Sequence, residues 1–377
     1  MLLKAYKFRI YPTHAQETTL NQTLETCRRV YNRTLALRKD AYEQERKTLG
    51  FYDTEKYLII WKKEDPTYLS KVHSQVLQNV QMRVDLAFKA FFRRVKQGEN
   101  PGYPRFKGYS RYDSFTYPQA GSAFRITSGF IKLSKIGDVK IKQHRAIEGK
   151  QKTCTVSKTA TGKWFVSIVC EQEPKPKPER EFKAVGIDLG VKNLAVLSNG
   201  EVIKPPRFYM EEEKELAKAQ RKLSATKKGT ELRNKRRKVV AHIYERIKNK
   251  RKDFCDKLSL SLVQNYSFIA FENLKIQNMV QEKDCYIAKH IYDAAWNQLI
   301  SMTTYKAEDA GSVVVLVNPY NTTKMCSQCG TIVHKTLSNR VHDCPVCGLK
   351  IDRDHNAAIN ILRLGMQSVG SIPKSRL

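Results

Sequence analysis

The first forty residues change from a strand pattern to a helix pattern at Pro12. Apolar and polar residues alternate loosely over residues 2–11, which is typical of a β-strand. Thr13 and Gln16 then have the spacing of a capping box, which marks a helix start. The apolar residues after it recur at helical spacing: Leu20, Leu24, Cys27, Tyr31 and Leu35. The opposite face of this predicted helix is basic and carries Arg28, Arg29, Arg33, Arg38 and Lys39.

A second long helix is predicted to begin near Ser70 or His73. Its apolar stripe consists of Val76, Val80, Val84, Ala87, Phe88, Phe91 and Val95. A segment rich in Gly and Pro, residues 98–104, ends the pattern. Residues 13–98 therefore predict a basic helical bundle that follows one strand. The aromatic residues expected in the core are Tyr11, Tyr31, Phe88 and Phe91.

Residues 105–172 have the character of a small β domain. Thr161 and Gly162 form a hairpin signal between two of its strand-like runs. The predicted strands are Phe124–Ile126, Phe130–Leu133, Val139–Ile141, Cys154–Ser157 and Trp164–Cys170. We expect a barrel that also uses the N-terminal strand. Residues 173–180 alternate Pro with charge and predict a stiff linker.

The C-terminal half alternates strands with helices. The predicted order is strands at 184–190, 193–197 and 201–203, a helix at about 208–265, a strand at 267–271, a helix at about 288–310, a strand at 312–317 and a helix at 356–364. The residues from Gly365 onward show little pattern and are expected to be loose.

Three acids mark these elements. Asp188 lies in an apolar strand, Glu272 ends a second one, and Asp354 opens the last helix. Each alone has a plain explanation, as a turn-facing carboxylate, a helix-start acid or an N-cap. The order of the strands and helices nevertheless favours a shared catalytic role over these separate explanations, because it is the order of the ribonuclease H fold. Acids at these places in that fold converge on one edge and hold two Mg²⁺ ions for phosphodiester hydrolysis.

Four of the nine cysteines form a metal-ligand pattern. Cys326 and Cys329 are followed, after fourteen residues, by Cys344 and Cys347, and a glycine follows each pair. Four thiolates at this spacing suit one tetrahedral Zn²⁺ in a closed structural site. Two disulfides or four unrelated thiols are the alternatives, and the scattered remaining cysteines favour a reducing compartment. His334 and His342, inside the loop, are alternative ligands but are expected to be solvated or to contact phosphate.

The charge of the chain indicates a polyanionic partner. The 377 residues include 68 Lys and Arg against 37 Asp and Glu, which gives a net charge of +31. Such a basic chain favours nucleic acid over a small neutral substrate. An apolar run of about 18 residues, as a membrane helix needs, is absent from the sequence. The charged N-terminus is unlike a secretory signal, so we expect a cytoplasmic protein without a membrane partner.

Nearly the whole chain resembles the TnpB family, the RNA-guided nucleases of bacterial and archaeal insertion sequences, which are related to type V CRISPR effectors. In that family the second Asp of the DRD motif is catalytic, which corresponds to Asp354 and leaves Asp352 without a clear role. The matching segments are GIDLGVKN at 186–193, ENL at 272–274, the four cysteines, DRDHNAAIN at 352–360, YKFRIYP at 6–12, GYPRF at 102–106 and NPY at 318–320.

The resemblance implies an α+β multidomain fold. Its parts are a wedge-type β-barrel at 1–12 and 103–174, an inserted helical recognition domain at 13–102, a RuvC-type ribonuclease H-like nuclease domain at 181–318 and 350–366, a zinc-ribbon insert that contacts target nucleic acid at 319–349, and a loose tail at 367–377.

The resemblance also implies an activity, namely cleavage of double-stranded target DNA beside a short adjacent motif. One chain would bind one guide RNA from the transposon end, near the nucleoid of a bacterium or archaeon. Asp188, Glu272 and Asp354 would be catalytic and hold two Mg²⁺ ions, and the four cysteines would hold one Zn²⁺. The alternatives are a guided DNA-binding regulator that does not cut and a transposase that joins strands. A single-chain type V CRISPR effector is a close variant of the RNA-guided endonuclease hypothesis.

Nucleic-acid contacts are expected on two surfaces. Residues 217–252 hold fifteen Lys and Arg against two acids, and such unbalanced charge favours RNA or heteroduplex contact over a solvated helix face. Polar side chains near residue 75 suit base edges, and exposed aromatics suit stacking. The candidate contacts are Tyr52, Ser74, Gln75, Gln78, Asn79, Thr116, Arg233, Lys235, Arg236, Arg237 and Lys238, with Phe115 and Tyr117 as further stacking residues.

Overall fold

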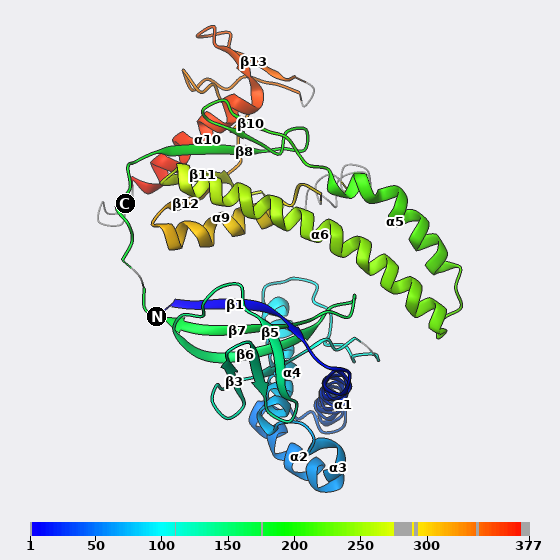
Figure 1. Ribbon diagram of the computed structural model, residues 1–377. Coiled ribbons are helices and arrows are strands. Elements are labelled where there is room, and N and C mark those ends of the chain that lie inside the picture. The colour runs from blue at the N-terminus through cyan, green and yellow to red at the C-terminus, as the bar shows by residue number, and fades with distance from the viewer. Residues whose placement is uncertain are drawn as a thin grey trace. The chain divides into compact units, whose positions relative to one another are not determined.

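The computed structural model describes residues 2–109, 111–174, 176–274, 289, 293–336 and 339–370. The chain divides into two compact units, Met1–Pro174 and Lys175–Leu377 (Figure 1). Of the helices in these described ranges, none combines the length and the apolar character that crossing a bilayer requires.

The first unit contains a seven-stranded antiparallel sheet with the order β2-β6-β7-β1-β5-β4-β3. The strands are β1 (Leu2–Tyr11), β2 (Ser114–Tyr117), β3 (Phe124–Thr127), β4 (Phe130–Leu133), β5 (Gly137–Lys142), β6 (Lys150–Lys158) and β7 (Trp164–Gln172). The N-terminal strand β1 lies in the middle and pairs with β7 and β5. The predicted strands, and the use of the N-terminal strand in the same sheet, are thus confirmed, whereas β2 was not predicted.

The sheet is curved so that its two edges approach each other. The hydroxyl of Tyr117 in edge strand β2 donates a hydrogen bond to the carbonyl of Ser134, just after β4, at 2.9 Å. Tyr6, Phe8 and Ile10 alternate into the core from β1, each no more than 3% exposed. The result is a barrel-like sheet, as the sequence predicts. Tyr11 has the opposite parity and is 47% exposed, so its expected place in the core is wrong.

Four helices complete the first unit: α1 (His14–Glu45), α2 (Phe51–Glu64), α3 (Pro66–Leu69) and α4 (Ser74–Lys96). The capping box of α1 is present, because Gln16 N donates to Thr13 Oγ1 and Thr13 N donates to Gln16 Oε1. The predicted apolar stripe of α1 is buried throughout. In α4 the stripe residues Val76, Val80, Val84 and Phe88 are buried, but Ala87 and Phe91 are only half-buried and Val95 is exposed.

Arg38 lies in the core of this unit, contrary to the predicted basic outer face of α1. It follows Leu35 by three residues and Tyr31 by seven, which places it on the buried stripe. Its guanidinium Nη1 donates to Asp85 Oδ1 at 3.0 Å and stacks 4.3 Å from the ring centre of Phe88. A charge in this position is tolerated because it is paired and hydrogen-bonded.

The second unit contains a five-stranded sheet with the order β10-β9-β8-β11-β12. The strands are β8 (Ala184–Leu189), β9 (Ala195–Leu197), β10 (Val202–Ile203), β11 (Phe268–Glu272) and β12 (Val313–Val317). β8, β11 and β12 are parallel neighbours, and β9 and β10 extend the sheet in antiparallel fashion. These are the predicted strands in the predicted order along the chain.

The helices of this unit differ from the prediction in two places. They are α5 (Phe208–Ser224), α6 (Glu231–Asn265), α9 (Trp296–Ala310) and α10 (Arg353–Val369). The stretch predicted as one helix is two helices, separated by a turn in which Gly229 has φ +87°. The last helix continues five residues past Leu364, because Gly365 and Val369 are buried against the sheet. The predicted helix start near residue 288 and the end of the tail, 371–377, lie outside the described residues.

Candidate functional site

Asp188 and Glu272 are neighbours because β8 and β11 are parallel. Ile187 pairs with Phe271 in this ladder, so the next residues in the two strands are Asp188 and Glu272. Adjacent strands lie about 4.8 Å apart, and residues in register point to the same side of the sheet. The two carboxylates therefore start from adjacent backbone positions.

The third acid comes from the first turn of α10, whose N-cap is Asp352. Asp352 Oδ1 accepts hydrogen bonds from the backbone N–H of Asp354 at 2.9 Å and of His355 at 3.1 Å. The structural alternative in which Asp354 itself caps the helix is therefore wrong. Asp352, which the sequence left without a role, fixes the start of the helix and frees the Asp354 side chain.

Two glycines let α10 approach the sheet closely. A Cβ atom at Gly186 of β8 would lie 2.2 Å from the Ala358 carbonyl oxygen, and one at Gly365 would lie 2.7 Å from Ala270 Cβ. Figure 1 shows α10 lying along this sheet. The close approach brings Asp354 near enough for its charge to act on Asp188.

We expect Gly186→Ala to impair the site through α10. The new methyl group collides with the helix backbone, and overpacking of this kind costs about 1–3 kcal/mol. The thermal midpoint should fall, and target cleavage should fall by more than the loss of folded protein explains. Gly370→Ala, whose Cβ would make only ordinary contacts beyond 3.4 Å at the other end of α10, is the control. Unchanged cleavage in a destabilised Gly186→Ala variant would contradict this coupling.

The three carboxylates form a buried cluster of like charge. Asp188, Glu272 and Asp354 are 8%, 6% and 9% exposed. Burial raises the pKa of Asp188 well above its usual value, and the charges of Glu272 and Asp354 raise it further. Burial also raises the pKa of Glu272, and a hydrogen bond from Thr322 opposes that rise. The site therefore disfavours the ionised forms of Asp188 and Glu272 unless a cation is present.

The cluster has few compensating partners. Arg353 donates from Nε and Nη2 to Asp354 Oδ1 at 3.0 and 2.9 Å, and Arg340 Nη1 lies 3.9 Å from Asp354 Oδ2. Thr322 Oγ1 donates to Glu272 Oε1 at 2.5 Å. Within the described ranges, neither Asp188 nor Glu272 has an ion pair. Asp188 and Glu272 thus carry buried negative charge without an ion pair, and carboxylate oxygens are the donors that hard divalent cations such as Mg²⁺ prefer. Unlike the four cysteines, the three acids do not have all their ligand atoms close enough together in this structure to form a ready metal site.

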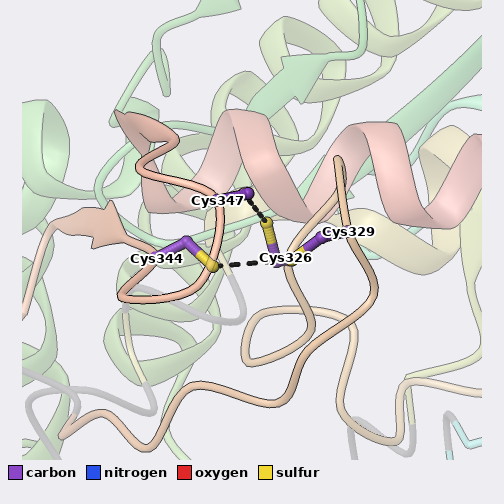
Figure 2. A group of neighbouring side chains, drawn as sticks. All are labelled: Cys326, Cys329, Cys344 and Cys347. Atoms are coloured by element: carbon purple, nitrogen blue, oxygen red, sulfur yellow. Dashed lines mark hydrogen bonds between the residues drawn. The ribbon is translucent and has the colours of Figure 1, made fainter.

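The four cysteines meet at one point, as the sequence predicts. All four sulfur atoms lie within 4.8 Å of one another, and they point toward a common centre (Figure 2). The Sγ atoms of Cys326 and Cys347 are 3.6 Å apart, as are those of Cys329 and Cys344. A tetrahedral Zn²⁺ with bonds of about 2.3 Å separates its sulfurs by about 3.8 Å. The geometry fits such an ion and is far too wide for disulfides, at about 2.05 Å.

Matching turns support the two cysteine pairs. Gly330 N donates to the Cys326 carbonyl and Gly348 N to the Cys344 carbonyl, both at 2.9 Å. Both glycines have positive φ, 81° and 74°, which side chains rarely adopt. The second pair lies in a hairpin of β13 (Val341–Asp343) and β14 (Lys350–Asp352).

His342 is not the solvated loop residue that the sequence suggests. It is fully buried, and its ring Nδ1 meets the Lys335 ammonium. Burial lowers its pKa, and the charge of Lys335 lowers it further. His334, in contrast, is exposed.

The candidate base-reading residues lie on α2, on the start of α4 and on β2. Tyr52 is 78% exposed, and Gln78 and Asn79 are half-buried. The other three have protein partners. Ser74 Oγ accepts from Lys62 Nζ, Gln75 Nε2 donates to Gln119, and Thr116 Oγ1 accepts from Arg83 on α4. Phe115 and Tyr117 are at most 1% exposed, so their proposed stacking on bases is wrong.

The dense basic run divides into structural and exposed side chains. Arg233 Nη1 donates to the carbonyls of Leu223 and Thr226, and Arg236 Nη1 donates to the Lys222 carbonyl at 2.6 Å. These two guanidiniums therefore satisfy the C-terminal carbonyls of α5. Lys235, Arg237 and Lys238 are exposed, although Lys235 pairs with Glu231 at 3.0 Å.

Sequence reasoning missed three polar residues beside the acids: Thr322, Asn356 and Asn360. All three are at most 2% exposed, and the two asparagines bind the backbone of the segment that leads to Cys326. One signal was available, because asparagines four residues apart share a face of a helix. Thr322 gives no such signal, since it lies outside any periodic element.

Three segments of the chain match models of known protein families. Residues 167–283 match the OrfB family of IS605, described as a probable transposase. Residues 296–361 match a Cas12f1-like TNB domain, and residues 1–47 match a helix-turn-helix domain of the OrfB family.

Two curated relatives extend over almost the full length. A putative RNA-guided DNA endonuclease of Streptomyces pristinaespiralis is 36% identical, and the alignment covers 96% of this chain and 89% of the relative. The putative RNA-guided DNA endonuclease InsQ of Escherichia coli K12 is 31% identical over 96% of this chain and 92% of its own length. The chain belongs to the TnpB family.

A solved structure supports the same fold. The protein in a cryo-EM structure of a Cas12f1–sgRNA–target DNA complex superimposes with a TM-score of 0.58 and 13% identity, covering 96% of this chain and 98% of that one.

Proposed function

We propose that this protein is a transposon-associated, RNA-guided DNA endonuclease that hydrolyses phosphodiester bonds at Asp188, Glu272 and Asp354. The observation that carries the chemistry is the set of three buried carboxylates, two of which, Asp188 and Glu272, have no ion pair among the described residues. The guided activity is supported by the names of two relatives that align over nearly their full lengths.

The three acids would hold two Mg²⁺ ions. Bound there, these ions would activate the attacking water and stabilise the leaving oxygen. The oxygen of water forms a bond to phosphorus, the bond from phosphorus to the 3′ oxygen breaks, and that oxygen gains a proton. The products carry a 5′-phosphate and a 3′-hydroxyl. Arg353 holds Asp354 with two hydrogen bonds to Oδ1, so Oδ2, which lies 3.9 Å from Arg340 Nη1, would be the oxygen available to a metal ion.

The four cysteines would hold one structural Zn²⁺. All four ligand positions are filled by protein, so this ion would fold the ribbon rather than take part in the reaction. The ribbon would cover residues 319–349 and contact target nucleic acid, as an insert in a nuclease domain formed by 181–318 and 350–366.

The first unit would supply the remaining recognition. A wedge domain at 1–12 and 103–174 and a helical recognition domain at 13–102 would hold one guide RNA and expose Tyr52, Gln78 and Asn79 to the motif beside the target. The exposed cations of α6 (Lys235, Arg237 and Lys238) would contact nucleic-acid backbone. Base pairing with the guide would then select the sequence, and the protein would bind shape and charge.

One observation favours a second candidate, because the family that matches 167–283 is described as a probable transposase. Acids in a sheet of this kind can also support strand transfer. Joined DNA ends in the reaction products would identify that activity, whereas free 5′-phosphate ends would exclude it.

The RNA that the protein carries tests the guided part of the proposal. We expect protein purified from cells with its native locus to retain one discrete RNA after a high-salt wash, because nonspecific phosphate contacts weaken steeply with salt. Sequencing should show a fixed scaffold that ends in a variable guide. A smear of unrelated RNA would contradict guided recognition.

A further inference from the structure

Two buried asparagines on α10 bind the segment that enters the cysteine ribbon. Asn356 Nδ2 donates to the Met325 carbonyl at 2.8 Å, and its Oδ1 accepts from Ser327 N at 2.9 Å. Asn360 Nδ2 donates to the carbonyls of Met325, at 2.6 Å, and of Thr322, at 2.9 Å. Both asparagines are fully buried, so these contacts are shielded from water.

The same segment reaches one of the acids through Thr322. Its hydroxyl lies 2.5 Å from Glu272 Oε1 and 3.2 Å from the Pro319 carbonyl. A hydroxyl has one hydrogen to donate, and the shorter contact to the carboxylate is the stronger one. Thr322 is 2% exposed, so water has little access to replace it.

We propose that Thr322 is a positioning residue that fixes the Glu272 carboxylate for metal binding, and that Asn360 holds Thr322 in place. This inference rests on the proposed function, since it takes Glu272 to be a metal ligand. The hydrogen bond occupies Oε1 in one direction and so limits rotation of the carboxyl group. Glu272 is then oriented by the segment that leads into the cysteine ribbon, Thr322–Met325, and not by a neighbouring strand.

The arrangement assigns a task to Asn360, which lies outside the acid set. Its amide binds the carbonyl of the residue whose side chain binds Glu272, so α10 carries Asp354 in its first turn and supports Glu272 two turns later. If Asn360 were purely structural, its hydrogen bonds to the backbone carbonyls of Thr322 and Met325 would matter only for stability. Removing the Thr322 hydroxyl would then leave metal binding by the acids unchanged.

The test compares three threonine variants of the full-length chain freed of RNA. Thr322→Val removes the hydroxyl at nearly constant shape, and Thr322→Ser retains it. Thr323→Val makes the same change at the next residue, which is half-buried and has no side-chain contact to an acid among the described residues. Mn²⁺ affinity is measured by calorimetry. In the RNA-loaded protein, the Mg²⁺ concentration for half-maximal cleavage is measured separately from the maximal rate.

We expect Thr322→Val to weaken Mn²⁺ binding and to raise the half-maximal Mg²⁺ concentration by about 10–100-fold, the usual effect of losing a hydrogen bond to a ligand. Zinc content should stay at one per chain. Thr322→Ser should restore affinity, and Thr323→Val should match the wild type. Asn360→Ala should shift affinity in the same direction and also lower the thermal midpoint.

Two results would overturn the inference: wild-type Mn²⁺ affinity in Thr322→Val, or equal losses in Thr322→Val and Thr322→Ser. Glu272→Gln separates this failure from failure of the proposed function. If Glu272→Gln loses metal binding and cleavage while Thr322→Val behaves as wild type, only the positioning role is wrong. If Glu272→Gln cleaves normally, Glu272 is no ligand and the proposed site itself is wrong.

Discussion

Asp188→Asn is expected to abolish target cleavage and to stabilise the metal-free protein. Losing one carboxylate removes metal-ion stabilisation worth several kcal/mol. At 1.36 kcal/mol per tenfold, cleavage should fall by at least about 10³-fold. The variant keeps the size and shape of the side chain, so binding of guide RNA should persist. Electrophoresis of a matched target in Mg²⁺ measures the first effect.

The stability effect follows from the raised pKa of Asp188. A carboxyl whose pKa is higher in the folded protein binds its proton more tightly there than in the unfolded chain. The metal-free protein therefore loses stability as pH rises from the ordinary carboxyl pKa, about 4, through the raised folded value. Asn cannot ionise and avoids this loss, so its thermal midpoint at neutral pH should exceed that of the wild type.

Added divalent metal should make the wild type more stable than Asp188→Asn, the reverse of the order expected without metal. Mg²⁺ should raise the midpoint of the wild type more than that of Asp188→Asn, because only the wild type has the full ligand set. Asp253→Asn changes a side chain that is 65% exposed and that pairs with Lys257 alone among the residues the structure describes. It is the matched control and should leave cleavage and stability unchanged. If Asp188→Asn still cleaves the target, the conclusion that these acids carry out the reaction is wrong.

Loss of zinc is expected to unfold the ribbon and to stop cleavage with it. Structural zinc contributes about 10–16 kcal/mol of apparent binding energy in small zinc domains. Cys344→Ser should therefore reduce bound zinc, measured by mass spectrometry, from one per chain to almost none. Cleavage should fall as well, because the segment that leads into the ribbon is hydrogen-bonded to α10 at Met325 and Ser327. The same segment is hydrogen-bonded to Glu272 through Thr322.

Cys255→Ala provides the control for this experiment. Cys255 is buried in α6 and lies outside the cysteine cluster, so its variant should keep one zinc ion. Counting free thiols in the denatured, metal-free wild type separates zinc from disulfides. Nine free thiols agree with a metal site, and five, the number left by two disulfides, would contradict it.

The sequence singles out the three acids through the order of the elements that carry them, because each acid alone has a plain structural explanation. Asp188 is a charge within an apolar strand, and such a residue requires a partner, a metal or a cleft. The cysteines are equally conspicuous, since their spacing has a single strong structural meaning. The cysteine pattern depends on a few neighbouring residues, so it can be recognised without the fold, whereas the joint role of the acids depends on the order of strands and helices over residues 184–364. The structure adds that parallel pairing of β8 with β11 makes Asp188 and Glu272 neighbours.

What the sequence does not reveal depends on contacts between distant segments. Thr322 lies fifty residues from Glu272, and nothing local distinguishes it from Thr323. Helix α2 was missed because only Thr54, Leu58 and Trp61 are buried in its fourteen residues, which is too sparse a stripe to detect. The basic run was correctly found as a cluster of charge. Its division into structural and exposed arginines depends on the turn that folds α6 back on α5.

The most direct test of guided cleavage is to change the guide and leave the protein unchanged. The purified complex is prepared with two RNAs that share the scaffold and differ only in the guide, and each is given one DNA that carries both target sequences. We predict that the cut moves with the guide, requires Mg²⁺, leaves 5′-phosphate ends and is absent with Asp188→Asn. Cutting at the same place with both guides, or without RNA, would contradict RNA-guided endonuclease activity.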